Sequence, residues 1–131
     1  MDDSKERKYD LEDRLVDFSI LIIDVVEILP NTKASNHLAN QLIRSGTSPA
    51  LNYGEAQSAE SKSDFIHKLK IILKELRETR ICLRIIKRLK LKKPIGNIDF
   101  VYDECNQLIS IFVKSIKTVQ SRNGKQNIQK K

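Results

Sequence analysis

The chain has 131 residues, of which 40% are hydrophobic and 31% charged, and its formal net charge is +7. Only four Gly and three Pro are present, which is typical of one globular, helix-rich domain and excludes collagen-like and disordered classes. No apolar run reaches ~18 residues and residues 1–8 carry mixed charge, so we expect no membrane-spanning helix and no signal peptide.

The first predicted helix covers residues 11–29 and ends at Pro30. Its core residues recur at steps of four and three, as on one face of a helix: Leu11, Leu15, Phe18, Ile22, Val25 and Leu29. Further apolar residues, Ile20, Leu21, Ile23 and Val26, make the apolar surface wider than one core needs. Because soluble monomers rarely expose large apolar patches, this excess width predicts a homo-oligomer.

The second predicted helix begins after an N-cap at Asn31 or Thr32 and ends near residue 56. Leu38 and Leu42 face inward, and the spacing also places Ser45 and Pro49 on this side. Pro49 lacks a backbone N–H, so the helix either bends there or restarts after Ser48. We favour one continuous helix with a local distortion.

The third predicted helix runs from an N-cap at Ser61 or Ser63 to about Lys92, before Pro94. Its core stripe is Phe65, Leu69, Ile72, Leu76, Thr79, Leu83 and Ile86. The fourth starts at about Asn97 and uses Val101, Cys105, Leu108, Phe112, Ile116 and Val119. Short connections between long helices predict an all-α, antiparallel up-down-up-down four-helix bundle over residues 1–120. Residues 121–131 hold one apolar residue and are predicted to be a disordered basic tail.

No catalytic or metal-binding constellation is recognisable. His37 and His67 lie on different predicted helices without a ligand-spaced partner, and we interpret both as surface residues. Cys82 and Cys105 lie on or beside apolar stripes, where a lone cysteine acts as a small hydrophobe. Two cysteines cannot form a secreted disulfide framework, so a cytoplasmic location is expected. The sequence predicts a non-enzyme without a metal or cofactor.

A polar row follows one face of the second helix at steps of four, four and three: Arg44, Ser48, Asn52 and Glu55. Glu75 and Glu78 on the third helix could pair with Arg44 across the bundle. Two interpretations stay open, a network that fixes helix register and a ligand site. We favour the structural one, because the row lacks a pair of titratable groups suited to acid–base work. Replacing Arg44 with Ala should then lower the melting temperature.

Charge is divided unevenly along the chain. Residues 1–60 have a net charge of −5 and residues 61–131 a net charge of +12. The second half contains a basic row that could neutralise the phosphates of RNA or DNA. Its members are Arg77, Arg80, Arg84, Lys87, Arg88, Lys90, Lys92 and Lys93. The alternative is a solvated surface without a polyanion partner. Aromatic residues are few, which favours backbone contact over reading of bases.

Five segments resemble the four-helix-bundle proteins encoded in intervening sequences of 23S ribosomal RNA genes, also called the S23 ribosomal protein family. They read DLEDRLVDF at residues 10–18, QLIRSGTS at 41–48, NYGEA at 52–56, SKSDFIHKL at 61–69 and KELRET at 74–79. The resemblance covers residues 10–120. Two departures affect the partner surface: Arg80-Ile81-Cys82-Leu83 stands where many relatives have an aromatic pair, and Pro49 replaces an aliphatic residue.

This resemblance implies a bundle that assembles into a ring-like homopentamer. It also implies kinship with the accessory variability proteins of diversity-generating retroelements, which bind a reverse transcriptase and nucleic acid through a basic surface. Two functional hypotheses follow. The leading one is a non-enzymatic oligomer that binds the RNA or DNA backbone with little sequence choice, and the alternative is a protein adaptor such as a reverse-transcriptase accessory subunit.

Overall fold

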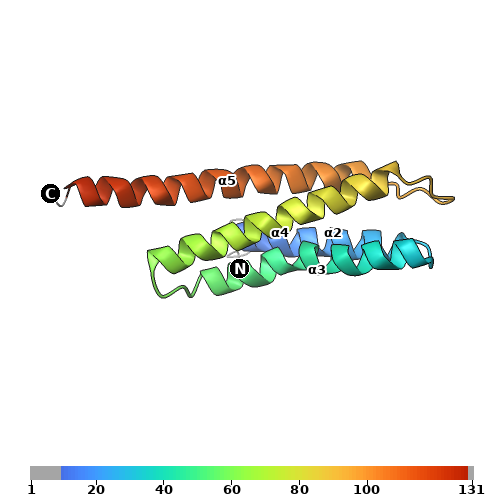
Figure 1. Cartoon of the computed structure of the whole chain (residues 1–131), viewed down its shortest axis with the longest axis horizontal. Coiled ribbons are helices and arrows are strands. Elements are labelled where there is room, and N and C mark those ends of the chain that lie inside the picture. The colour runs from blue at the N-terminus through green and yellow to red at the C-terminus, as the bar shows by residue number, and fades with distance from the viewer. Residues whose placement is uncertain (1–9, 130–131) are drawn as a thin grey trace, which may run out of the picture.

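The computed structural model of the chain describes the backbone of residues 10–129 and the side chains as far as Arg122. It contains four helices and, over these residues, no strand: α2 (Leu11–Ile28), α3 (Lys33–Ala56), α4 (Lys62–Arg88) and α5 (Ile98–Gln129). Each helix packs against the next one along the chain, and α5 returns to α2. Successive helices run in opposite directions (Figure 1). The predicted all-α class with four helices is therefore confirmed.

The first three helices begin at residues whose side-chain oxygen accepts a hydrogen bond from a backbone N–H three residues further on. These N-caps are Asp10, Thr32 and Ser61. They settle both choices that the sequence left open, in favour of Thr32 over Asn31 and of Ser61 over Ser63.

Pro49 lies inside α3, which is one continuous helix. The residue is buried and faces the core, together with Ser45 and Gly46. The prediction of an uninterrupted helix is confirmed. Ser45 and Gly46 are small, so this face of α3 can lie close to the core. Where α3 passes α2, a side chain at Gly46 would collide with Ile22, so this crossing needs a residue without a Cβ.

Two helix ends differ from the sequence prediction. α4 stops at Arg88, not near Lys92, because Leu89 adopts extended backbone and the chain turns so that Ile95 enters the core. α5 continues past the predicted boundary at residue 120 to Gln129, through most of the segment predicted to be disordered. Low hydrophobicity indicates that a segment does not pack, but Gln, Lys and Arg are good helix formers and can extend an existing helix. The extension projects beyond the rest of the bundle (Figure 1).

Most residues of the predicted stripes are buried in the core, whereas Leu11, Leu29, Leu38, Phe65 and Val119 are only partly buried. Leu15, Phe18 and Ile22 of α2 are fully buried, as are Leu76 of α4 and Phe112 of α5. None of the described helices is long and apolar enough to cross a membrane.

The contact between α2 and α5 is the least extensive in the bundle, and a polar bridge lies on it. The Arg14 guanidinium donates to both carboxylate oxygens of Glu104, at 2.8 and 2.9 Å, and to Gln107 Oε1 at 2.9 Å. A forked arginine–carboxylate pair of this kind fixes the relative position of two helices.

Candidate nucleic-acid interface

The predicted basic row divides into three sets in the structure. Arg77, Arg84 and Arg88 are exposed on the outer side of α4. Their spacing of seven and four residues returns them to the same face at each step. These three residues remain available to a partner in solution.

Arg80 and Lys87 instead face α5. Arg80 is half-buried and donates to Asn106 Oδ1 at 3.4 Å. Lys87 pairs with Asp99 at 2.9 Å and lies 4.4 Å from the centre of the Tyr102 ring. Both cations thus hold α4 and α5 together, and we remove them from the candidate interface.

Lys90, Lys92 and Lys93 are exposed in the connection between α4 and α5. Because α4 ends at Arg88, these lysines do not continue the helical spacing. They add positive charge at one end of the interface, outside the regular spacing of the helix.

Two lysines outside the predicted row complete the helical part of the surface. Lys70 and Lys74 are exposed and continue the arginine stripe toward the start of α4. Lys70, Lys74, Arg77, Ile81, Arg84 and Arg88 advance by four, three, four, three and four residues, which is the spacing of one helix face. This spacing is visible in the sequence. The predicted row departed from it because it continued from Arg77 to Arg80, which faces α5, and not to Ile81.

We call the five cations Lys70, Lys74, Arg77, Arg84 and Arg88 the outer stripe. Within the part of the chain whose side chains are described, none of the five forms an ion pair. The outer stripe spans about 27 Å at 1.5 Å per residue of helix.

Two half-exposed isoleucines interrupt the outer stripe. Ile81 keeps 48% and Ile85 44% of its surface accessible. Beside Ile81, an open cavity of about 550 Å³ lies between α4 and α5, and Lys70, Lys74 and Arg77 contribute to its lining. The exposed face of α4 therefore carries both cationic and apolar side chains.

The polar row of α3 forms two separate bridges to α4. Arg44 lies 3.4 Å from a carboxylate oxygen of Glu75 and 3.4 Å from one of Glu78, and Lys68 lies 2.9 Å from Glu55. The Arg44 side chain is 55% exposed, so its pairs resemble surface pairs, which contribute about 0–1 kcal/mol each. The melting temperature of an Arg44→Ala variant should accordingly fall only slightly.

Ser48 and Asn52, the other two members of the row, bond to their own helix. The Ser48 hydroxyl donates to the Arg44 carbonyl at 2.6 Å, and the Asn52 amide donates to the Ser48 carbonyl at 3.1 Å. Neither side chain is paired with α4 by a hydrogen bond. The four residues share one face, but they do not converge on a common ligand position.

The described residues contain no group of three or more His, Cys, Asp or Glu side chains placed to hold a metal ion. His37 and His67 are exposed. Burial raises the pKa of the Cys82 thiol to about 11 and that of the Cys105 thiol to about 12. Both thiols are thus protonated at neutral pH, and neither is a thiolate nucleophile.

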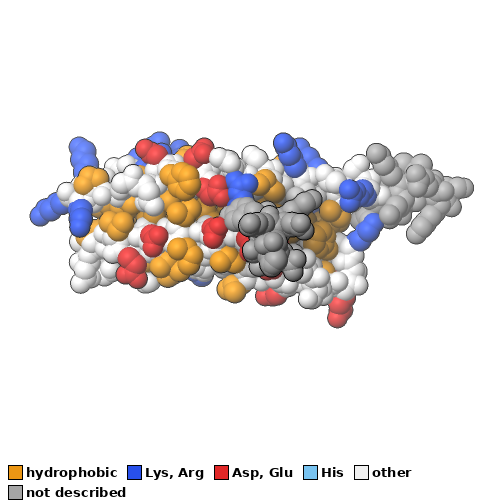
Figure 2. All heavy atoms as spheres, turned by 180° about the vertical axis from the view of Figure 1, so that it is seen from behind, with side chains coloured by type: hydrophobic (Ala, Val, Ile, Leu, Met, Phe, Trp, Pro, Cys, Tyr) orange, Lys and Arg blue, Asp and Glu red, His pale blue; other side chains and the backbone are white. Residues whose placement is uncertain are grey.

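Further large apolar side chains are exposed on α2 and α3. Val16 and Ile20 of α2 are 48% and 52% exposed, one helical turn apart, and Ile43 and Leu51 of α3 are exposed two turns apart. Seen from behind, hydrophobic side chains gather along the bundle (Figure 2). We call these four residues the α2–α3 apolar face.

Comparison with known proteins identifies the family. The model of the 23S rRNA-intervening sequence protein family matches residues 7–114, which include α2, α3, α4 and the first half of α5. The chain belongs to this family. The matched region contains the outer stripe and the α2–α3 apolar face.

A solved structure supports the same assignment. The chain is 29% identical to a protein of unknown function from the S23 ribosomal protein family of Bacteroides thetaiotaomicron, with a TM-score of 0.72. The likeness covers 81% of this chain and 94% of the Bacteroides protein. No curated protein matches the chain. The four-helix fold of the chain is thus shared with a solved member of the S23 ribosomal protein family.

Proposed function

We propose that this chain is a non-enzymatic, cytoplasmic, homo-oligomeric protein that binds the nucleic-acid backbone through the outer stripe of α4. The observation that carries the proposal is the row of five exposed cations without a carboxylate partner among the described side chains. Each cation that meets a phosphate releases condensed counterions, which favours association at moderate salt. The free, buried state of both cysteines accords with a reducing compartment.

Little sequence choice is expected from this surface. The outer stripe lies on one straight helix and includes no Asn or Gln that could form the paired hydrogen bonds to a base edge. Arginine and lysine on a regular spacing meet phosphates of any sequence. RNA and DNA are both candidate ligands on this ground.

A protein adaptor is the second candidate, and the exposed isoleucines favour it. Ile81 and Ile85 would gain from burial against the apolar side of a partner helix, with acidic residues of that helix facing the arginines. A reverse transcriptase, suggested by the sequence resemblance, is one such partner.

We also propose that the α2–α3 apolar face is buried between copies of the chain. Of the four residues that made the first helix wider than one core needs, Ile20 is exposed, whereas Leu21, Ile23 and Val26 are partly buried. Val16 of α2 and Leu51 of α3 are exposed as well. The symmetry of a ring-like homopentamer comes from the sequence resemblance. Light scattering of the purified protein tests the assembly, and a stable 15.1 kDa monomer at micromolar concentration contradicts it.

The nucleic-acid proposal is tested by titrating structured RNA and duplex DNA across a salt series. Log affinity should fall linearly with log salt, with a slope of about −0.9 for each phosphate contact on duplex DNA. Replacing Arg77, Arg84 and Arg88 with Ala should make that slope shallower by about 2.7. Arg80 stays in place, because it holds Asn106.

The single variants Arg77→Ala and Lys33→Ala form a matched pair. Both remove one exposed charge, but Lys33 lies at the start of α3, outside the outer stripe. Only Arg77→Ala should change the slope. Absence of binding at ~50 mM salt, where screening is weak, contradicts the proposal and leaves the adaptor.

A further inference from the structure

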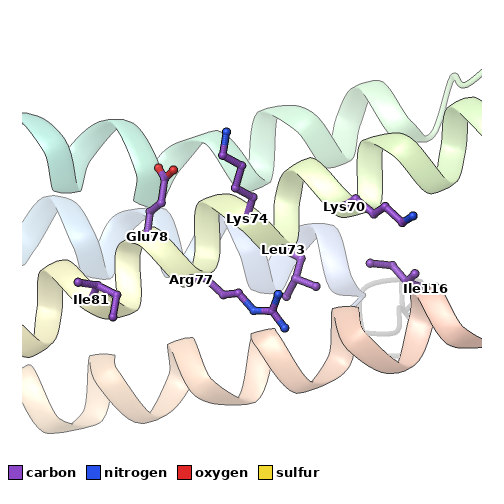
Figure 3. Close-up of a pocket in the computed structure, with 7 residues that line it drawn as sticks. All are labelled: Lys70, Leu73, Lys74, Arg77, Glu78, Ile81 and Ile116. Atoms are coloured by element: carbon purple, nitrogen blue, oxygen red, sulfur yellow. The ribbon is translucent and has the colours of Figure 1, made fainter.

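The cavity between α4 and α5 has an apolar floor and a cationic rim. Leu73 and Ile81 of α4 and Ile116 of α5 supply the apolar part of its lining. Figure 3 shows Arg77 and Leu73 extending toward α5, whereas Lys74 and Glu78 extend the other way. The cavity volume of about 550 Å³ lies within the ~300–1,000 Å³ typical of ligand clefts.

A smaller hollow adjoins this cavity along α4. It measures about 250 Å³ and is lined by Ile81, Arg84, Ile85 and Arg88. Ile81 belongs to both linings, so the two hollows follow each other along the helix. Apolar side chains and cations therefore alternate over the length of the outer stripe.

This alternation distinguishes between the two forms of nucleic acid. A duplex presents phosphates at its surface and keeps its bases stacked inside, so it would meet the cations and leave the isoleucines unmatched. A single strand presents phosphates and unpaired bases side by side, and its bases can be turned out and stacked on planar or apolar groups. The Arg77 guanidinium, which lines the cavity and extends toward α5, offers such a plane.

We infer that the α4–α5 groove binds single-stranded RNA or DNA, with phosphates on the outer stripe and bases in the two hollows. The inference rests on the proposed nucleic-acid function and adds the class of ligand to it. The negative carboxylate on the rim, Glu78, does not oppose this arrangement directly, because it lies 3.4 Å from Arg44 on the side of α3.

The test compares three ligands by fluorescence anisotropy at ~50 mM salt, where electrostatic association is strong. They are a short single strand, its abasic counterpart with the same number of phosphates, and a duplex with that number of phosphates. RNA and DNA versions of the single strand show which sugar is preferred. Covering half of an isoleucine predicts that the single strand binds about fivefold more tightly than the abasic strand.

Variants locate the effect. Ile81→Asn should bring the single strand to the affinity of the abasic strand and leave abasic binding unchanged. Ile81 is half-exposed, so the variant is expected to fold, and circular dichroism checks this. Phe100→Asn is the matched control, because Phe100 is an exposed apolar residue of α5 that lines neither hollow.

Equal affinity for all three ligands overturns this inference and leaves backbone binding in place. Absence of binding to any of them overturns the proposed function as well. Binding of an acidic amphipathic peptide that is abolished by Ile81→Asn, without any preference for the single strand, assigns the groove to a protein.

Discussion

The hydroxyl groups of Ser45 and Thr79 form a buried polar contact between α3 and α4 in the described core. They lie 2.9 Å apart, and both residues are fully buried. Thr79 Oγ1 is also 2.8 Å from the Glu75 carbonyl oxygen. No buried side-chain nitrogen or oxygen of the described residues lacks a hydrogen-bond partner, so this pair is fully satisfied.

Replacing Thr79 with Val should destabilise the protein by about 1–3 kcal/mol, because the buried Ser45 hydroxyl loses its partner. The double variant Ser45→Ala/Thr79→Val should recover part of this loss. Urea unfolding of the two single variants and the double variant gives the coupling energy. Thr118→Val, at an exposed position of α5, is the control, and an equal effect there would contradict a specific role of the pair.

Glu75 lies in an unfavourable electrostatic position despite its arginine partner. Its burial raises the pKa of the carboxyl, the nearby Glu78 raises it further, and Arg44 lowers it without reversing the shift. The folded protein therefore binds the Glu75 proton more tightly than the unfolded chain does. By linkage, the stability contributed by this group is present at low pH and is lost as pH rises through the raised pKa.

We therefore expect the difference in stability between wild type and Glu75→Gln to depend on pH. Wild type should gain stability relative to the variant as the pH is lowered from 7 toward 4.5, the ordinary pKa of a glutamate carboxyl. Glu60→Gln, which removes an exposed carboxyl, is the control. Melting temperatures measured across this range would contradict the argument if the two variants behaved alike.

At the scale of elements, the crossing of α2 and α3 depends on Gly46. A Cβ placed there would lie 2.7 Å from both Cγ atoms of Ile22. Ile22 is β-branched and fully buried, so its side chain cannot turn away easily. Gly54 of the same helix has no heavy atom within 4 Å of such a Cβ.

Gly46→Ala and Gly54→Ala should consequently have opposite effects. Gly54→Ala should stabilise the protein by about 0.5–1 kcal/mol, because alanine is the better helix former. Gly46→Ala gains the same propensity but forces α2 and α3 apart, at a cost of about 1–3 kcal/mol from overpacking. Guanidinium unfolding measures both, and stabilisation by both substitutions would show that the α2–α3 contact is looser than described.

At the scale of the whole molecule, the two exposed surfaces lie on different pairs of helices. The outer stripe follows α4 beside α5, and the α2–α3 apolar face lies on the other two helices. Self-association through the apolar face would leave the cations of every copy accessible. A ring would then present several outer stripes together, which strengthens binding to one long polyanion.

A charge on the apolar face should separate the copies. Val16→Asp with Ile20→Asp should shift the mass measured by light scattering toward the monomer, since a carboxylate cannot be buried without a partner. Each residue is about half-exposed, so the monomer should stay folded. Phe100→Asp, another exposed apolar position, should leave the assembly intact. An unchanged mass for the double variant would place the interface elsewhere.

The sequence determined the number of helices and their core faces, and it limited two of the N-caps to a pair of candidates each. Steps of four and three residues define a helix face wherever the chain lies, so Phe18, Leu76 and Phe112 could be assigned to the core from spacing alone. The candidate caps followed from local chemistry, because a Ser, Thr or Asn side chain can accept a hydrogen bond from the first backbone N–H groups of its own helix. The continuity of α3 through Pro49 was also predictable, because its spacing kept Ser45 and Pro49 on one face.

Tertiary structure decided which polar residues on a helix meet a neighbour. Arg80 and Arg84 look equivalent in the sequence, but Arg80 reaches Asn106 on α5 and Arg84 remains exposed. Arg44 pairs with Glu75 and Glu78, as expected. Its exposure depends on how α3 and α4 pack, and this exposure reduces the contribution of the ion pairs to stability. Periodicity fixes the direction of a side chain from its own helix axis, whereas burial depends on the helix that packs opposite, often far away in the chain.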